Sequence, residues 1–193
     1  MEFHHKPVLF EETIRSLAIR PEGTYIDGTM GGGGHSEAIL KQLTTGRLLS
    51  IDQDPDAIQA AGKRLAPYPQ SIRVRGNFSQ MAELARAQGI DAVDGVLLDI
   101  GVSSYQLDTP ERGFSYHHDA PLDMRMSKEG PSARDLVNTL GQQELADIIF
   151  RYGEDRSARR IAQGIVQARE QAPIETTAQL AEIIKASVPA AVR

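Results

Sequence analysis

The chain contains a run of residues that could hold a ligand directly against the main chain. Residues 27–35 read Asp-Gly-Thr-Met-Gly-Gly-Gly-Gly-His, between the short apolar run 24–26 and a helical pattern over 36–43. A glycine loop between a strand and a helix presents its backbone at the carboxyl end of a parallel sheet. Glycine reaches positive φ and has no Cβ, so a ligand can approach closely. Four consecutive glycines therefore predict a binding loop rather than an ordinary surface turn.

Two common phosphate-binding motifs do not fit this loop. The dinucleotide fingerprint needs glycine at its first, third and sixth positions, and counting from Gly31 the sixth position is Ser36. The phosphate loop needs a lysine after its last glycine, and no lysine follows any glycine of the run. Asp27, just ahead of the loop, would repel a pyrophosphate. The loop therefore favours a ligand that carries positive charge.

A second acidic residue follows the next predicted strand, residues 47–51. Asp52 lies roughly 20 residues past the glycine loop, where an acid can accept hydrogen bonds from both hydroxyls of a ribose. Asp54 and Pro55 open a predicted helix over 56–66, because proline and acids both suit a first helical turn. Asp54 is therefore interpreted as a helix cap. A cationic ligand with a ribose and no phosphate describes S-adenosylmethionine.

Asp99 ends the fourth predicted strand, residues 93–99, at the same edge of the sheet. A carboxylate there can accept a hydrogen bond from an exocyclic amine and sharpen its lone pair for attack on a sulfonium methyl group. Methyl transfer depends on in-line placement of donor and acceptor, so positioning should supply much of the rate. Asp99 could instead cap a loop, and Ser103 and Ser104 could simply satisfy backbone groups. No Gly-x-Ser-x-Gly elbow is present for a serine nucleophile.

The histidines predict no metal site. His4–His5 and His117–His118 are adjacent pairs, whereas helical metal ligands are spaced i, i+4. His35 differs from them because it closes the glycine loop, with its ring nitrogens close to any ligand there.

Composition excludes some classes of protein. The chain has 193 residues, room for one α/β domain or for an incomplete domain plus an insertion. It has no cysteine, which excludes a disulfide scaffold and a thiolate metal site. Neither a membrane span nor a signal peptide is recognisable, which predicts a cytoplasmic location and no membrane partner.

Net charge gives no strongly basic footprint for nucleic acid, since the chain carries −5. This net charge does not exclude a small local patch of basic residues. One dense cluster of arginines is present: Arg151, Arg156, Arg159 and Arg160. These side chains could contact phosphates or form a solvated helix face.

Strand and helix patterns alternate over the first hundred residues, which predicts an α/β fold with a parallel sheet and helices on both faces. The predicted strands are 24–26, 47–51, 71–75 and 93–99, and the predicted helices are one before Pro21, 36–43, 56–66, and 79–88 with Ser79 as N-cap. Residues 101–131 are predicted to be loop, followed by helices over 132–140, 142–152, 156–171 and 176–188. No fifth strand is found, so we expect a helical insertion cut off before the sheet resumes, in the N-terminal part of a longer protein.

Five ordered motifs resemble the bacterial ribosomal RNA small subunit methyltransferase H family, and the resemblance covers essentially all 193 residues. The motifs occupy residues 27–36, 51–55, 97–104 with 106–108, 111–115 and 119–126. The resemblance implies a Rossmann-like S-adenosylmethionine-dependent methyltransferase sheet with a helical insertion domain and C-terminal strands beyond residue 193. It also implies residues 1–104 as the cofactor-binding core and residues 105–193 as loop plus helical insertion on the substrate side.

Carried over by motif, the resemblance implies cofactor contacts and a catalytic residue. The cofactor-binding residues would be Gly33, Gly34, His35, Asp52, Phe78, Asp99 and Gln106. Asp52 would hold the ribose, Phe78 would lie at the adenine, and Asp99 and Gln106 would complete the pocket near the methionine end. Asp99 would also be catalytic, although the sequence has Asp-Ile-Gly-Val here instead of the Asp/Asn-Pro-Pro-aromatic motif of many base amino-methyltransferases. Arg112, Phe114 and residues 121–126 are candidates for the substrate cleft.

The predicted function is therefore methylation of the N4 amine of a cytosine in 16S rRNA, with the small ribosomal subunit as partner. The reaction would be a direct displacement, because no cysteine is present to attack C6. Methylation of a small-molecule or protein amine would use the same cofactor half, whereas an NAD-dependent oxidoreductase is disfavoured by the missing sixth-position glycine.

A truncated cofactor-binding or assembly protein without activity is a further alternative. In that case exposed apolar side chains of the helical half would mark a subunit contact, such as that of a homodimer. The candidates are Leu145, Ile148, Ile149 and Ile161.

Overall fold

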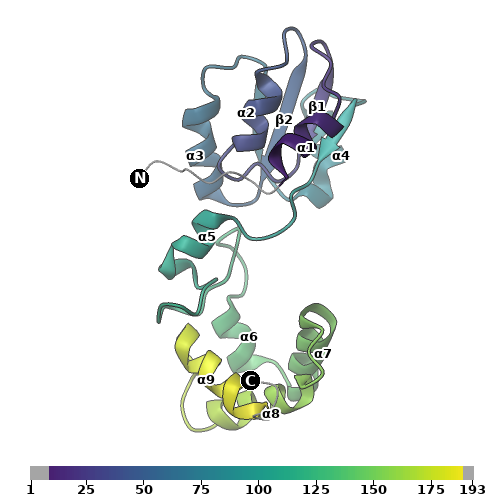
Figure 1. The fold of residues 1–193 in the computed structure, drawn as a ribbon. Helices are drawn as coiled ribbons and strands as arrows, with labels where there is room; N and C mark the ends of the chain where they lie inside the picture. The colour runs from purple at the N-terminus through teal and green to yellow at the C-terminus, as the bar shows by residue number, and fades with distance from the viewer. Residues whose placement is uncertain (1–8, 189–193) are drawn as a thin grey trace. The chain divides into compact units, whose positions relative to one another are not determined.

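The structure, a computed structural model, describes residues 9–188 (Figure 1). Contacts divide the chain into two compact units, Met1–Gly101 and Val102–Arg193. The functional division predicted at residues 104 and 105, into a cofactor side and a substrate side, stays a prediction. His4, His5 and Val8 lie outside the described residues. No helix in the described part of the chain is long and apolar enough to cross a bilayer.

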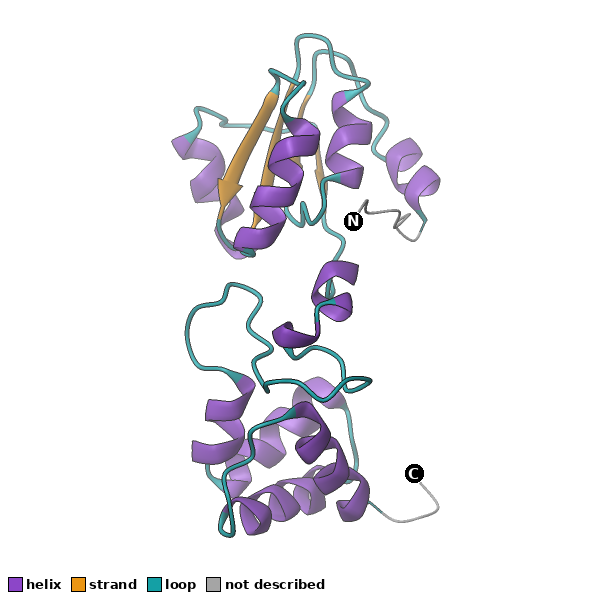
Figure 2. Cartoon of the chain, turned by 90° about the vertical axis from the view of Figure 1, so that its left-hand side faces the viewer, coloured by secondary structure: helices purple, strands orange, loops and turns teal. Residues whose placement is uncertain are grey.

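The first unit is built on a parallel sheet of four strands, which confirms the predicted fold class. The strands are β1 (Thr24–Asp27), β2 (Arg47–Asp52), β3 (Ser71–Arg75) and β4 (Gly95–Leu97), in the order β3-β2-β1-β4. Ile26 of β1 is paired with Leu49 of β2 and Val96 of β4, so β1 and β2 are the central strands. Figure 2 shows the strands with helices beside them. All strands therefore present their carboxyl ends at one edge.

Helices cover both faces of this sheet. Successive side chains of a strand point to opposite faces, so the apolar residues of β1 and β2 need cover on both. Tyr25 and Leu48 pack in one core with α1 (Phe10–Ser16), α2 (Gly34–Leu40) and α3 (Pro55–Leu65). Ile26 and Leu49 pack in another core with α4 (Met81–Ala87). Burial on both sides leaves β1 and β2 almost continuously buried along their length.

Two predicted helix starts were wrong. The helix after the glycine loop begins at Gly34, not Ser36, and it ends at Leu40. Before α4 the chain forms a 3-10 turn, η1 (Phe78–Gln80), and its N-cap is Asn77, whose side chain accepts from the Ser79 N–H at 2.9 Å. Asn77 wins the cap because its Oδ1 reaches this amide two residues on, as Asn side chains do in turns. The predicted Ser79 cap is inside the turn instead.

The second unit is helical, with α6 (Ala133–Thr139), α7 (Gln142–Gly153), α8 (Ala158–Arg169) and α9 (Thr177–Ser187) close to their predicted positions. The prediction of loop over 101–131 was wrong in part, because α5 (Ser104–Asp108) and the 3-10 turn η2 (Pro110–Arg112) lie there. These segments are too short for a helical hydrophobic period. Their signals are local: a capping box from Ser103 to Gln106 and a proline that opens η2.

The apolar residues predicted to mark a subunit contact are mostly in the core of this unit. Leu145 and Ile161 are 4% and 3% exposed and pack with residues of α6, α8 and the segment before α9. Ile149 is partly buried against the same core, whereas Ile148 is 38% exposed. The exposure expected of Leu145 and Ile161 was wrong, because the facing helices α7 and α8 bury each other's apolar sides.

Candidate functional site

The glycine loop connects β1 to α2 through backbone conformations that favour glycine. Gly31 and Gly33 have φ of 50° and 78°, in the left-handed region, and Gly33 is the N-cap of α2. The Met30 N–H donates to the Ile51 carbonyl at 3.0 Å, which holds the loop against the end of β2. A Cβ added at Gly33 would lie 3.1 Å from Ala61 Cβ, so α3 also limits this position. The loop is therefore a fixed backbone feature of this sheet edge.

Asp27, the last residue of β1, is directed into the unit and fully buried. One carboxylate oxygen accepts from the Thr29 N–H at 3.1 Å and the other from the Ser36 hydroxyl at 2.6 Å. The Ser36 Oγ is in turn 2.9 Å from the Ser50 Oγ of β2. The sequence predicted that the Asp27 carboxylate faces the ligand. In the structure its hydrogen bonds instead connect β1 to the loop and to α2.

Burial raises the pKa of Asp27 to about 6. The hydrogen bonds from Ser36 and Thr29 oppose this rise, and the nearby carboxylates of Asp52 and Asp99 add to it. Asp27 therefore changes its protonation in weakly acidic solution, well above the ordinary range of an aspartate.

Asp52 ties the glycine loop to the end of β2. Its Oδ2 accepts from the Gly31 N–H at 2.8 Å, and its Oδ1 accepts from the Asp54 N–H at 2.9 Å. Burial is the main cause that raises the pKa of Asp52, although these backbone hydrogen bonds counter it. Each carboxylate oxygen has a second acceptor site, so the partly exposed side chain keeps capacity for hydroxyl donors. The predicted cap is confirmed: Asp54 accepts from the Asp56 N–H at 2.9 Å at the start of α3.

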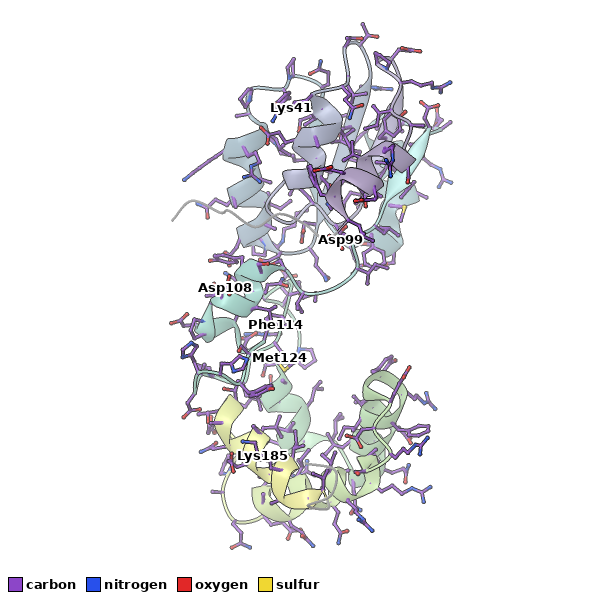
Figure 3. The ribbon with its side chains drawn as sticks, viewed as in Figure 1. Lys41, Asp99, Asp108, Phe114, Met124 and Lys185 are labelled. Atoms are coloured by element: carbon purple, nitrogen blue, oxygen red, sulfur yellow. The ribbon has the colours of Figure 1, made fainter. Side chains whose placement is uncertain are left out.

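Asp99 and His35 meet at the same edge of the sheet. The Asp99 N–H donates to the Thr29 Oγ1 at 2.7 Å, and the Asp99 side chain is 60% exposed. Asp99 is labelled in Figure 3. His35 Nδ1 is 3.9 Å from Asp99 Oδ2, which is too long for a direct hydrogen bond. The loop residue Thr29 thus fixes the position of the chain at the end of β4.

The His35 ring is buried against Phe10, with ring centroids 5.2 Å apart. Burial lowers the pKa of His35, and this effect outweighs that of the Asp99 carboxylate, which raises it. The lowered pKa favours the neutral ring. Its Nε2 is buried and makes no hydrogen bond within the described residues. A buried polar atom without a partner is costly, so this nitrogen is suited to an additional hydrogen-bonding group such as a ligand atom.

The predicted cofactor residues fall into both units. The first unit brings Gly33, Gly34, His35, Asp52 and Asp99 to the ends of β1, β2 and β4 and the start of α2. Phe78, in η1, lies beside the same loop, because a Cβ added at Gly28 would be 3.2 Å from Phe78 Cβ.

Gln106 belongs to the second unit, where it is buried. Its side chain accepts from the Ser103 N–H at 3.0 Å while Ser103 Oγ accepts from the Gln106 N–H at 3.2 Å. The structure thus gives Gln106 and Ser103 a capping role at α5. The cofactor contact of Gln106 stays a prediction.

The candidate cleft residues form a tightly bonded loop in the second unit. Arg112 is buried, and its Nη2 donates to the carbonyls of Arg125 and Met126 at 2.9 and 3.0 Å. Its guanidinium lies 5.9 Å from the ring centroid of Phe114. The backbone carbonyl of Arg112 accepts from the Met124 N–H at 3.0 Å. Arg112 therefore holds the loop 121–126 in place, and its role at a substrate cleft stays a prediction.

Sequence reasoning missed three polar residues that position the site: Thr29, Ser36 and Ser50. The available signal was a serine, Ser50, inside an otherwise apolar strand, which needs a buried hydrogen-bond partner. Thr29 gave no signal of its own, because its partner is 70 residues away in the sequence.

Residues 2–193 of the chain match the sequence pattern of the MraW methylase family. The chain belongs to this family. Proteins called "Ribosomal RNA small subunit methyltransferase H" from Symbiobacterium thermophilum and Lachnospira eligens are each 58% identical over 196 aligned residues, covering 100% of this chain. The chain spans 62% of the length of these relatives. The resemblance seen in the sequence motifs is thereby confirmed.

Among solved structures, the C-terminal domain of precorrin-6Y C5,15-methyltransferase from Rhodobacter capsulatus is similar with a TM-score of 0.42 and 22% identity. The similarity covers 54% of this MraW-family chain and 55% of that one.

Replacing Asp27 with asparagine tests the buried carboxyl group. The folded pKa of about 6 is above the ordinary 3.8, so the stability that Asp27 contributes is full below about pH 4 and is lost as the pH rises through 6. Asparagine does not ionise. Relative to Asp27→Asn, the wild-type free energy of unfolding should therefore fall by about 3 kcal/mol from about pH 4 to about pH 7, measured by urea denaturation. The exposed Asp91→Asn is the control, and a constant difference between wild type and Asp27→Asn would contradict the assignment.

Replacing Thr29 with valine tests the link between the loop and Asp99. Valine keeps the shape of threonine but cannot accept the Asp99 N–H, so this amide should exchange with solvent about fivefold faster, for a loss of about 1 kcal/mol. Hydrogen exchange followed by NMR gives the rate for this single amide. Thr29→Ser keeps the hydroxyl and should exchange like the wild type. Equal rates in all three proteins would show that the bond does not hold Asp99.

Proposed function

We propose that the protein containing this chain transfers a methyl group from S-adenosylmethionine to the N4 amine of a cytosine in 16S rRNA. The observation that carries the proposal is membership of the MraW methylase family over residues 2–193. Relatives at 58% identity that carry the words "Ribosomal RNA small subunit methyltransferase" support RNA as the substrate class. The arrangement of the sheet edge supports the chemistry.

The residues at this edge fit the cofactor. The backbone of Gly33 and Gly34 lies at the start of α2, where a ligand can contact it without a side chain between them. The unpartnered Nε2 of His35 offers one further hydrogen bond. Asp52 retains acceptor capacity for ribose hydroxyls, and Phe78 offers a ring for the adenine. When bound, S-adenosylmethionine supplies a methyl group that is activated by the positive charge on its sulfur. The negative carboxylates of Asp52 and Asp99 favour binding of this positive charge.

Asp99 is the residue proposed to act on the nucleophile. Its carboxylate is largely exposed at the carboxyl end of β4, while its backbone is held by Thr29. It accepts a hydrogen bond from the cytosine amine and directs the nitrogen lone pair at the methyl carbon. As the nitrogen took up the methyl group that bound S-adenosylmethionine would supply, Asp99 would take the proton that leaves the nitrogen, directly or through water. Held geometry supplies much of the rate in such a displacement.

Replacing Asp99 with alanine in a chain of the full length of the relatives tests this role. Loss of the hydrogen-bond acceptor should lower the rate of methyl transfer about a hundredfold or more. Affinity for S-adenosylmethionine should fall by much less than the rate, because the loop and Asp52 are intact. Transfer of labelled methyl groups to isolated small subunits gives the rate, and calorimetry gives the affinity.

The matched control is Asp91→Ala, an exposed acid of the same unit that precedes β4. It should keep full activity. Full activity of the Asp99→Ala enzyme would contradict the role of this carboxylate. Transfer to small-molecule or protein amines, with none to rRNA, would contradict the proposed substrate.

A further inference from the structure

In the second unit α7 leads into α8 (Figure 1). The segment from Phe150 to Arg160, at this junction, carries exposed arginines and exposed aromatic rings. We refer to it as the α7–α8 corner. Phe150 and Tyr152, in the last turns of α7, are 61% and 83% exposed. The four arginines of the basic cluster are also exposed: Arg151, Arg156, Arg159 and Arg160.

Within the described part of the chain these four arginines have no partner. Their guanidinium groups make no hydrogen bond or ion pair with any of residues 9–188. Elsewhere in the same unit, by contrast, Arg125 is paired with Asp123 and Arg134 with Glu175. The charge of the corner is therefore available to an outside group.

The local charge is positive although the chain as a whole carries −5. Residues 151–160 hold four arginines against two acids, Glu154 and Asp155. The Asp155 carboxylate accepts from the Ser157 N–H at 2.6 Å, so part of its hydrogen-bonding capacity is used by the backbone. Because the net charge of the chain is negative, an anionic partner would be directed to a local positive patch of this kind.

Helix stability does not account for this arrangement. Arg159 and Arg160 lie in the first turn of α8, which contains no acidic residue. Cations at this positive end of a helix dipole are unfavourable, whereas acids are preferred there, as in α6 with Asp135 and α7 with Glu144. Exposed Phe150 and Tyr152 add nothing to the core of the unit either.

We propose that the α7–α8 corner binds single-stranded RNA, with its arginines on the phosphates and Phe150 and Tyr152 stacked on bases. Arginine presents a planar fork that matches phosphate, and aromatic rings stack on unpaired bases of any sequence. An acidic protein segment would satisfy the arginines but would leave the two rings without a matching group. The choice of RNA also rests on the proposed function, whereas the exposed arginines and rings are features of this unit alone.

Titration of the 193-residue chain into a short fluorescein-labelled single-stranded RNA, followed by fluorescence anisotropy, tests the proposal. Replacing Arg156, Arg159 and Arg160 together with glutamine should weaken binding strongly and reduce the dependence of log affinity on log salt by about 2, at about 0.7 per lost phosphate contact. Arg86→Gln, an exposed arginine of the first unit, is the control and should leave both quantities unchanged.

A second pair of variants tests the stacking. Tyr152→Ala should weaken RNA binding about fivefold or more, while Tyr152→Phe keeps the ring and should bind like the wild type. Because these side chains are exposed, circular dichroism should show unchanged helix content in every variant. Binding of RNA by the triple-arginine variant as tightly as by the wild type, or no binding by the wild type, would overturn the proposal. So would a Tyr152→Ala protein that binds RNA normally while polyglutamate displaces the RNA, which would indicate an acidic protein partner.

This test is independent of methyl transfer. If the chain binds S-adenosylmethionine but the arginine variant keeps its affinity for RNA, the surface assignment fails and the proposed function stands. In a chain of the full length of the relatives, the triple-arginine variant should raise KM for the RNA with kcat unchanged, whereas an altered kcat alone would contradict a binding role.

Discussion

Hydrogen bonds from loop amides to two strand-end carboxylates are the constraint on which the candidate site depends. Asp52 accepts from Gly31, and Asp27 accepts from Thr29 and from the Ser36 hydroxyl. Consecutive glycines lose more conformational entropy on folding than other residues, so this loop needs such bonds to stay in one conformation. They fix its backbone at the ends of β1 and β2, where the helix α2 starts. The cofactor contacts proposed for the other residues at this edge all depend on this fixed loop backbone.

The same loop places the third carboxylate. The Thr29 hydroxyl accepts from the Asp99 N–H, so the segment after β4 is held by the loop that follows β1. Asp27 is enclosed and braces the fold, Asp52 is partly exposed, and Asp99 is largely exposed. Asp27 and Asp52 end their strands and Asp99 lies two residues beyond β4, and the three have different environments. Only the two that reach solvent can contact a ligand directly. The buried His35, with its unpartnered Nε2, lies beside them.

The sequence predicted the parts of this arrangement that follow from local patterns. The strand 71–75, the Asp54 cap and the helices of the second unit were predicted because periodicity and capping residues are visible in short windows. Long-range contacts were not predictable. The inward direction of Asp27 depends on Ser36 and Ser50, and the burial of Leu145 and Ile161 depends on how α7 faces α8. The short helix α5 was missed because five residues cannot display a helical period.

The most direct test of the central claim is calorimetric titration of the 193-residue chain with S-adenosylmethionine and, separately, with NAD, alongside a chain of the relatives' full length. The account predicts saturable binding of S-adenosylmethionine and none of NAD, because the loop, Asp52 and His35 fit a cationic nucleoside without a pyrophosphate. Asp52→Ala should weaken that binding. Equal binding of NAD, or no binding of S-adenosylmethionine by either chain, would contradict the assignment of this sheet edge as the cofactor site.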